Sequence, residues 1–600
     1  MNDEFLDDEL NEDIDETIDL SIYNDDKPSP KKPKLPFPII GIIIAVIVAI
    51  IVTVCITITI DIERKKPNGS YVDIFTYYGL SEDSVTLLYE GEYLNNIIQI
   101  DDMYYLEFSF VYNNICNNFY YDESLNSLLY TNATEIYSFP FASLDYDING
   151  EAKKSEYYIT VKEQDSIYIA LDFIKDKGPF TYITVDTPNI LVMVKDDTSI
   201  VPINFYEDAL IRVGASIKDE ILANPGEDVW YEVNEDCKDG WKAVATIEGL
   251  HGYVETKYIQ GNGESYTYDS GYEIEEYPNL IKDYELHLVW HGVYWSGNNN
   301  NISSLLKNTK GVTTVSPTWF KVENETGSLL SLADKNYVKY VHGLGMEVWP
   351  LVSDFTSTDG DGWSHKELFG NATNRRNLID NLIKEIKALG CKGLNIDFER
   401  ITTEVGDDYA QFMRELSVRC RKEGIILSVD VMVPTSYNMK YNYAVLGEFV
   451  DYVMIMGYDE YYSGANEAGP NASLPFEKNG IENGLLYIPS NKIVSGIPFY
   501  TRMWIESVNA NGETVLEAKT YYMQTALNTV ESMKLNKVWN EELQCYAAYG
   551  TVDGVTYRIW LEEERSMTAK LQLIDDYNLA GYAAWSLGQE MPSIWNVLNR

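Results

Sequence analysis

Polar and apolar residues alternate at the position where this chain gives its clearest structural signal. The segment reads, in order, Gly393, Leu394, Asn395, Ile396, Asp397, Phe398 and Glu399. Because successive side chains of a β-strand point to opposite faces, the three polar side chains share one face and the apolar side chains share the other. Burying carboxyl groups is costly unless they are paired or perturbed for a task. The pattern therefore predicts a functional site on a buried strand.

Helical spacing of apolar residues flanks this strand on both sides. Before it, apolar residues recur every three or four positions from residue 378 to 389, and the pattern stops at Gly390, as is typical of a helix end. After it, a second stripe begins at Tyr409 and ends at Gly424, and a strand is expected over residues 425–433. Strand, helix and strand in this order predict parallel pairing.

Residues 284–600 continue this alternation and predict an α/β fold, a (β/α)8 TIM barrel with a small α+β insertion at about residues 505–567. We expect this part to fold and act alone. Its eight strands are expected near residues 287, 312, 346, 393, 425, 452, 492 and 580.

A long uncharged apolar run lies near the start of the chain, at residues 35–60. It matches the roughly 20 residues that cross a bilayer as a helix, so we predict one transmembrane anchor. A cleaved signal peptide is the alternative, although its apolar core would be shorter and nearer the start. Residues 1–34 are dense in Asp and Glu and predict a disordered tail. The Lys and Arg balance slightly favours a cytoplasmic N-terminus, hence a single-pass cell-membrane protein with an extracytoplasmic catalytic domain.

Residues 70–198 are rich in Tyr and Asn and contain an internal repeat. The segment 105–111 aligns with the segment 168–174, and each is followed by aromatic residues and an Asp, namely Asp122 and Asp186. Two copies of one supersecondary unit explain this spacing. The pattern resembles the paired repeats of the copper amine oxidase N-terminal-like domain, which implies an α+β spacer without catalytic residues.

Residues 202–261 predict a small antiparallel barrel of short strands separated by Gly and Asp turns. The strands are expected at 209–213, 229–233, 241–247 and 252–258. Arg212-Val213-Gly214, Gly240-Trp241 and Gly252-Tyr253-Val254 resemble the bacterial SH3 family, which implies an all-β SH3-like module that binds the cell wall or acts as a scaffold. Trp241 and Tyr253 fit a ligand groove and a plain core equally well.

Composition narrows the possible partners. The formal net charge is −47 and no basic stripe occurs, which argues against nucleic acid as a partner. The six Cys and five His show no spacing typical of a zinc site or a disulfide framework. We therefore predict no metal and no cofactor.

The acid strand and three later segments resemble glycoside hydrolase family 18. The family signature on the fourth strand is Asp, Gly, apolar, Asp, apolar, Asp, apolar, Glu, and residues 392–399 follow it with Lys392 and Asn395 at the first two acid positions. The later segments occur in the family's order. They are Met456-Gly457-Tyr458-Asp459, Ser495 to Arg502 and Gly581 to Trp585, with residues 546–566 similar to the family's α+β insertion.

The resemblance implies substrate-assisted hydrolysis. Glu399 would protonate the glycosidic oxygen and later activate water, while the substrate's 2-acetamido oxygen attacks the anomeric carbon. Asp397 would orient the acetamido group, and Tyr458 would hold its oxygen. These three residues are the predicted catalytic set. The predicted substrate-binding residues are Asn395, Met456, Asp459, Trp585 as the apolar floor, Trp319 and Arg502.

Two positions depart from the signature. Asn395 cannot ionise, so we expect like-charge repulsion to raise the pKa of Asp397 less than an Asp there would. Lys392 lies outside the inward row and is expected to matter little. The variant Asn, Ile, Asp, Phe, Glu is similar to that of spore-cortex and related cell-wall hydrolases, which implies that activity is retained.

The expected function is hydrolysis of a glycan that contains N-acetylglucosamine. An anchor, a spacer and an SH3-like module favour peptidoglycan of the bacterium's own wall, and thus an N-acetylglucosaminidase over a chitinase. A chitinase or chito-oligosaccharide hydrolase is one alternative. A catalytically inactive carbohydrate-binding or wall-binding protein is another, but Glu399 is intact, whereas lectin-like members generally lose this acid.

Overall fold

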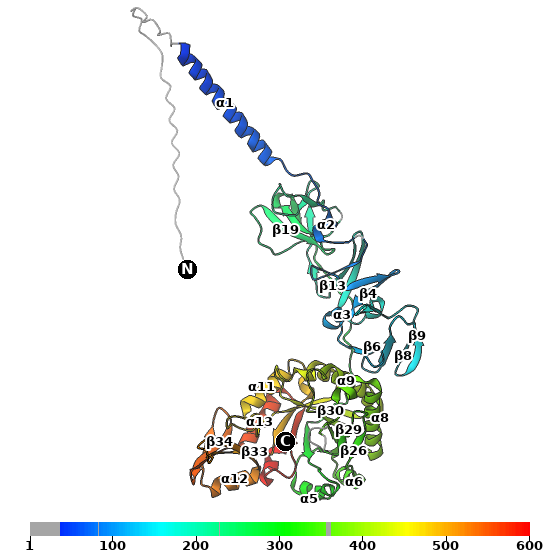
Figure 1. Cartoon of the computed structure of the whole chain (residues 1–600), viewed down its shortest axis with the longest axis vertical. Helices are drawn as coiled ribbons and strands as arrows, with labels where there is room; N and C mark the ends of the chain where they lie inside the picture. Colours follow the sequence, from blue (N-terminus) through cyan, green and yellow to red (C-terminus); the bar gives the residue numbers. More distant parts are fainter. Residues whose placement is uncertain (1–36, 82, 227, 356–361) are drawn as a thin grey trace, which may run out of the picture.

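The computed structural model describes residues 37–81, 83–226, 228–355 and 362–600. The acidic tail predicted at residues 1–34 lies outside them. Figure 1 shows four parts in succession along the long axis: helix α1 (Phe37–Lys65), a small β module, the repeat region and the C-terminal barrel.

Helix α1 contains the apolar run predicted from the sequence. Its segment Gly41–Lys65 is long and apolar enough to cross a membrane, and none of it is buried against the rest of the chain. The hydroxyl groups of Thr53 and Thr59 donate to backbone carbonyls four residues earlier, at 2.8 and 2.7 Å. The helix continues past residue 60, where Lys65 pairs with Asp61 at 2.7 Å. The helix thus satisfies these side chains internally, which suits an apolar surrounding.

The β module contains a five-stranded antiparallel sheet at residues 211–255. Four of its strands lie within the ranges predicted from the sequence or overlap them, whereas β17 was missed. The strands are β16 (Ile211–Arg212), β17 (Ile221–Ala223), β18 (Trp230–Glu232), β19 (Trp241–Thr246) and β20 (His251–Glu255). Trp230 fills the core of the module, while Trp241 and Tyr253 are half-buried. The likeness to SH3 domains stays a prediction.

In the repeat region, the same order of elements occurs twice, and each copy contains one of the aligned segments. The first order is β3 (Ile97–Ile100), β4 (Met103–Glu107), α3 (Phe108–Asn114), β5 (Phe119–Asp122) and β6 (Ser127–Thr131). The second is β10 (Thr160–Glu163), β11 (Ser166–Ala170), α4 (Leu171–Ile174), β12 (Phe180–Asp186) and β13 (Asn189–Lys195). The last strands of the two copies have different partners. Strand β6 pairs with β7 (Ile136–Pro140), whereas β13 pairs with β1 (Thr86–Tyr89).

The C-terminal part is a closed parallel barrel, as the sequence predicts. Strand β38 pairs with both β32 and β23, which closes the ring. The second and third barrel strands are each broken into two pieces, and β26 (Leu329–Ser331) only forms a hairpin with β25. The barrel strands are β23 (Leu286–His291), β24 and β25 (Thr314–Pro317, Phe320–Val322), β27 and β28 (Glu347–Val348, Leu351–Ser353), β29 (Gly393–Asp397), β30 (Ile426–Met432), β31 (Tyr452–Met456), β32 (Ile493–Pro498) and β38 (Gly581–Trp585).

Helices cover the outside of this barrel. Helix α8 (Ala372–Leu389) begins after Asn371, whose side chain accepts hydrogen bonds from two backbone amides, and ends at Gly390 with φ 73°. Helix α9 (Gly406–Glu423) ends at Gly424 with φ 65°. Both ends agree with the sequence prediction. The others are α6 (Lys335–Gly343), α7 (His365–Gly370), α10 (Tyr443–Phe449), α11 (Leu474–Gly484) and α13 (Glu564–Tyr577).

An inserted antiparallel sheet projects from the barrel between β32 and α13. It contains one helix, α12 (Met523–Ser532). Its strands are β33 (Tyr500–Val508), β34 (Thr514–Tyr522), β35 (Asn536–Asn540), β36 (Cys545–Val552) and β37 (Val555–Leu561). The sheet therefore begins a few residues before the predicted 505 and ends before 567.

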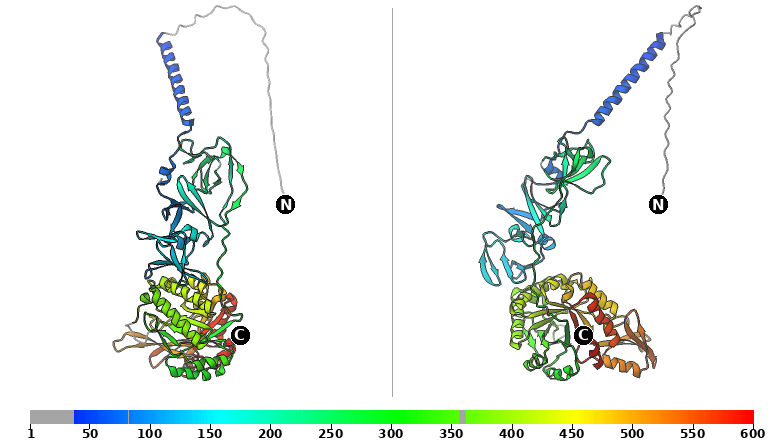
Figure 2. Two further views of the ribbon diagram at one scale, coloured as in Figure 1. Left: turned by 90° about the vertical axis from the view of Figure 1, so that its right-hand side faces the viewer. Right: turned by 180° about the vertical axis from the view of Figure 1, so that it is seen from behind.

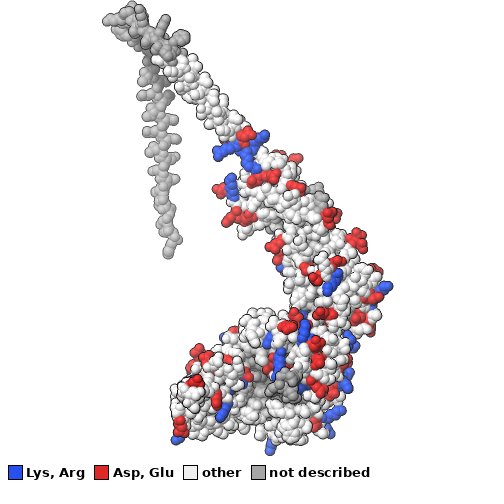
Figure 3. Space-filling model, viewed as in Figure 1, with Lys and Arg blue, Asp and Glu red and all other residues white. Residues whose placement is uncertain are grey.

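The segment that links the β module to the barrel runs beside the repeat region (Figure 2). Glu275 accepts a hydrogen bond from the amide of Ala133, and Tyr277 accepts one from Asn118 at 2.9 Å. Figure 3 shows α1 as an uncharged surface with Lys and Arg at its C-terminal end, followed by many scattered acidic side chains. No broad basic face is visible in this view.

Candidate active site

A cavity of about 600 Å³ opens at the carboxyl ends of the barrel strands. This is the end where barrel enzymes place their chemistry. Carboxyl groups and aromatic rings dominate its lining. They belong to Asp397, Glu399, Asp430, Asp459, Trp290, Tyr294, Phe355, Tyr458, Tyr462, Tyr500 and Trp585.

The alternation predicted for β29 is confirmed. Leu394, Ile396 and Phe398 are fully buried in the core between the barrel and its helices. Asp397 and Glu399 face the cavity at the end of the strand. Asp397 is 7% exposed, and its Oδ1 has no hydrogen-bond partner among the described residues. A buried acceptor without a partner at the floor of a cavity is suited to receive a donor from a ligand.

Asp354, which the sequence analysis missed, holds the backbone of the proposed acid. Its Oδ1 accepts a hydrogen bond from the amide of Glu399 at 3.1 Å, and its Oδ2 accepts one from the amide of Arg400 at 2.9 Å. His365 Nε2 lies 2.9 Å from the same Oδ2. The available signal was a polar pair, Ser353 and Asp354, at the end of a buried strand.

The environment of Glu399 raises its pKa to about 7. Burial is the largest cause, because it disfavours the charged form, and the negative charges of Asp354 and Asp459 add to it. A hydrogen bond with Asp397 and the charge of Arg400 act in the opposite direction. A carboxyl group with this pKa can both give and take a proton near neutral pH.

This pKa gives a prediction about stability. Because the pKa is about 7 in the fold and 4.5 in an unfolded chain, ionising Glu399 destabilises the fold as the pH rises from about 4.5 to above 7. The variant Glu399→Gln has no such cost. We expect it to exceed the wild type in stability by up to about 3 kcal/mol at pH 8 and to lose this advantage at pH 4.5. Thermal unfolding of the barrel at both pH values measures this, and an advantage that does not change with pH would contradict it.

Asn395 lies beneath the cavity and does not line it. Its Oδ1 accepts hydrogen bonds from Trp290 Nε1 at 3.0 Å and from Ser316 at 3.2 Å. Its Nδ2 donates to Asp430 Oδ1 at 2.8 Å and to Ser428 at 3.1 Å. The predicted contact of Asn395 with substrate is therefore corrected to support of the residues around it, since every polar atom of the amide is already engaged.

Asp430 places a second carboxyl group beside Asp397, where Asn395 has an amide. It lies on β30, where Ile396 pairs with Val429, so Asp430 is at the register position beside Asp397. The pKa of Asp397 is well above its usual value because of burial first and then the charges of Glu399, Asp430 and Asp354. The expectation that an Asp in place of Asn395 would raise this pKa further stays a prediction. The alternation of Ser428, Asp430 and Met432 was the signal that could have shown the carboxyl group of Asp430.

Four other predicted residues lie where the sequence placed them. Tyr458, Met456, Asp459 and Trp585 all line the cavity. Burial keeps the pKa of Tyr458 well above its usual value, so its hydroxyl remains a donor. Trp585 lies at a tilted angle to Trp290, with ring centroids 6.1 Å apart. These two rings form an apolar surface in the cavity.

Arg502 and Trp319 do not line the cavity. Arg502 is 8% exposed and its Nη1 lies 2.6 Å from Asp459 Oδ1, so it fixes Asp459. Trp319 is 1% exposed and belongs to the core, where its Nε1 donates to Asn299 at 2.8 Å and its ring packs edge-on against Tyr337. The prediction that Trp319 contacts substrate is thus not supported, because its ring packs in the core between the barrel and its helices. The sequence analysis missed Trp290, Tyr294, Phe355, Tyr462 and Tyr500.

The fold and the acid-lined cavity define a barrel of the glycosidase class. Residues 292–590 match the family model described as Glycosyl hydrolases family 18, and this part of the chain belongs to that family.

The relatives found in comparison include two proteins of Bacillus subtilis. A Bacillus subtilis (strain 168) protein with the provisional name sporulation-specific glycosylase YdhD is 31% identical over 40% of this chain and 58% of its own length. The Cortical fragment-lytic enzyme of the same strain is 28% identical over 39% of this chain and 54% of its own length. The chain thus spans little more than half of these relatives. The structure of the spore cortex-lytic enzyme SleL from Bacillus megaterium QM B1551 is 21% identical, covers 54% of this chain and 75% of that one, and has a TM-score of 0.46.

Proposed function

We propose that this protein is a membrane-anchored glycosidase that hydrolyses β-1,4-linked N-acetylglucosamine glycans with retention of configuration. The observation that carries the proposal is Glu399, a carboxyl group with a pKa of about 7 at the floor of an open cavity, beside Asp397 and Tyr458. The names of the two relatives, a glycosylase and a cortical fragment-lytic enzyme, support a glycan substrate.

In the first step, Glu399 gives its proton to the glycosidic oxygen while the bond to the anomeric carbon breaks. The acetamido oxygen of the same sugar forms a new bond to that carbon, which yields an oxazolinium ion and frees the leaving glycan as an alcohol. Because burial and nearby charges raise the pKa of Glu399 to about 7, its carboxyl group keeps the proton for this step near neutral pH.

Asp397 and Tyr458 are assigned to the acetamido group. The unpaired Oδ1 of Asp397 would accept the acetamido N–H and offset the positive charge of the oxazolinium ion. The Tyr458 hydroxyl would donate to the acetamido oxygen and keep it in line with the anomeric carbon.

In the second step, the ionised Glu399 takes a proton from water, and the hydroxide oxygen bonds to the anomeric carbon as the ring of the oxazolinium ion opens. Two displacements at one carbon give net retention, and Glu399 is protonated again for the next turnover.

Peptidoglycan is the substrate that we favour. An apolar helix that could anchor the chain in a membrane, followed by the β module and the repeat region, suits action on the cell's own wall. We also propose that the β module binds the cell wall and that the N-terminus of the chain is cytoplasmic. Chitin is the second candidate, because it supplies the same 2-acetamido sugar.

Product analysis tests the proposal. The full chain is incubated with purified peptidoglycan and, separately, with chitin oligomers, and the products are identified by mass spectrometry. Release of fragments with N-acetylglucosamine at the new reducing end supports the function, and the preferred glycan identifies the substrate. Binding without any cleavage of either glycan would support the inactive wall-binding protein instead.

The pH dependence of the rate follows from the pKa of Glu399. Because the acid must be protonated, kcat/KM is expected to fall about tenfold per pH unit above pH 7. Asp459→Asn removes a negative charge that raises this pKa, so the alkaline limb should move to lower pH. Glu404→Gln, an exposed acid outside the cavity, is the matched control and should leave the limb in place. A limb near pH 4.5 in the wild type would contradict the assignment.

A further inference from the structure

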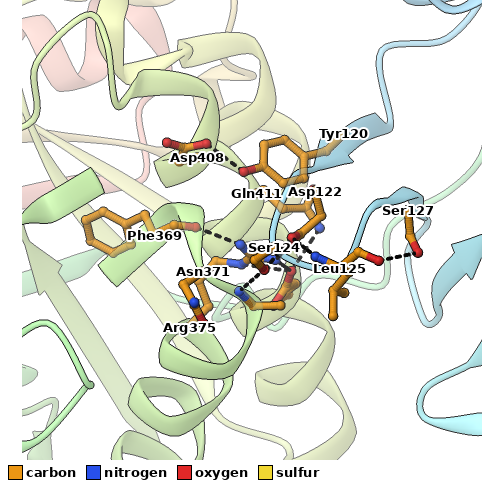
Figure 4. Close-up of polar contacts among 12 residues, drawn as sticks. Tyr120, Asp122, Ser124, Leu125, Ser127, Phe369, Asn371, Arg375, Asp408 and Gln411 are labelled. Atoms are coloured by element: carbon orange, nitrogen blue, oxygen red, sulfur yellow. Dashed lines mark hydrogen bonds and ion pairs between the residues drawn. The ribbon is translucent and has the colours of Figure 1, made fainter. Parts of the chain in front are cut away.

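The repeat region is attached to the barrel through a buried cluster of charges (Figure 4). Asp122 Oδ2 lies 2.5 Å from Arg375 Nη2 of helix α8, and neither side chain is exposed. The same Arg375 atom lies 2.9 Å from Glu415 of helix α9. Separating the two parts would leave a buried guanidinium without one of its two carboxylates, which is strongly unfavourable.

Further hydrogen bonds cross the same contact. Tyr120 donates to Asp408 Oδ1 at 2.6 Å, and Ser124 accepts from the amide of Ala372 at 3.0 Å. Arg414 of helix α9 donates to the carbonyl of Asn117 at 2.8 Å. The cluster thus ties the loop ends of β5 to both α8 and α9, so the repeat region is docked firmly and does not hang from a flexible link.

Helix α7 lies between this contact and the active site. Arg375 Nη1 donates to the carbonyl of Phe369, near the end of α7, at 2.7 Å. Lys366, near its start, pairs with Asp408 at 2.8 Å. Both ends of α7 are therefore held by side chains that the repeat region itself contacts through Asp122 and Tyr120.

The other side of α7 reaches the proposed acid. His365, the first residue of α7, pairs with Asp354, which accepts the backbone amides of Glu399 and Arg400. The Phe369 ring also packs against Phe398, with ring centroids 5.8 Å apart. A shift of α7 would thus move the backbone on which Glu399 is placed.

From these contacts we infer that the repeat region is a positioning part of the hydrolase and not only a spacer. Asp122 and Tyr120 act through α7 and Asp354 to fix Glu399, so they are positioning residues. This inference rests on the proposed function. It also revises the expectation that residues 284–600 act alone, since that piece would lose Asp122 and expose Arg375.

The internal repeat supplies a matched control. Asp186 is the counterpart of Asp122 in the second copy, at the end of β12, but it is exposed. We compare Asp122→Asn and Tyr120→Phe with Asp186→Asn in the full chain in detergent micelles. The Tyr120→Phe variant removes only one hydroxyl group, and it tests the contact if Asp122→Asn fails to fold.

Two measurements test the inference. The first is kcat and KM on chitin oligomers or peptidoglycan, whichever the wild type cleaves. Both contact variants should lower kcat about tenfold with KM within about twofold, because a small misplacement of a catalytic group lowers the rate and not the binding. The second is hydrogen–deuterium exchange, which needs no turnover. Exchange should become faster in α7 and at Glu399 and Arg400, and Asp186→Asn should change neither quantity.

Each outcome decides the matter. Wild-type kcat and wild-type exchange in both contact variants would overturn the inference, as would a fall in kcat without faster exchange in α7, or faster exchange spread over the whole barrel. If the wild type cleaves neither glycan, the proposed function fails. Exchange at Glu399 and Arg400 then decides alone whether the repeat region positions this segment.

Discussion

Replacing Glu399 by Gln should lower kcat on an N-acetylglucosamine glycan by about 10²- to 10⁴-fold, with the fold and glycan binding retained. Gln has the size of Glu but no acidic proton, so the leaving oxygen departs as an unstable alkoxide. Turnover is measured on the glycan, and binding by isothermal calorimetry with the same glycan.

A glycoside with a nitrophenyl leaving group sharpens this test. Nitrophenolate leaves without a proton, so the first-step rate of Glu399→Gln on that substrate should fall much less than its rate on the glycan. Glu404→Gln is the control for the loss of one carboxyl charge nearby. Turnover of the glycan at the wild-type rate by Glu399→Gln would remove Glu399 from the mechanism.

The second large effect is expected at Asp397. Asp397→Asn should lower kcat about 10²- to 10³-fold, because an amide cannot offset the charge of the oxazolinium ion as a carboxylate does. The unpaired, buried Oδ1 of Asp397 is the atom concerned. The loss should be equal on the glycan and on the nitrophenyl glycoside, since it does not depend on the leaving group.

Asn395→Asp provides a matched comparison, because Asn395 lies two residues before Asp397 on the same face of the strand. It would put a third carboxyl group beside Asp397 and Asp430, and it would replace the Nδ2 donor of the amide with an oxygen. A modest loss here against a large one at Asp397 separates support of the site from direct contact with substrate. Equal losses at both positions would mean that Asp397, like Asn395, only supports the residues around it.

Local pattern was sufficient for most of the barrel. The alternation at residues 393–399 is resolved into buried and cavity-facing sides, because a strand between two different environments must present two faces. Helix α8 and helix α9 end at the glycines where their apolar stripes stop. The break between β27 and β28 and the short strand β17 were not foreseen, since their few residues carry no period of their own.

The errors at the site share a cause. Trp319 was predicted to bind substrate, but its ring packs in the core between the barrel and its helices. Asn395 was judged by its own strand, although its amide donates a hydrogen bond to Asp430 of the neighbouring strand. The surroundings of both residues depend on which distant segments pack next to them in the fold.

By itself the sequence determined the apolar helix, the alternating acid strand, the barrel and the residues Asp397, Glu399 and Tyr458, because each follows from periods or motifs within a short window. Only the tertiary structure decided that Asp354 holds Glu399, that Asp430 lies beside Asp397 and that Asp122 reaches Arg375, 253 residues away. These are pairings between distant segments. Their energies come from burial and from the absence of water between the partners, which no local pattern encodes.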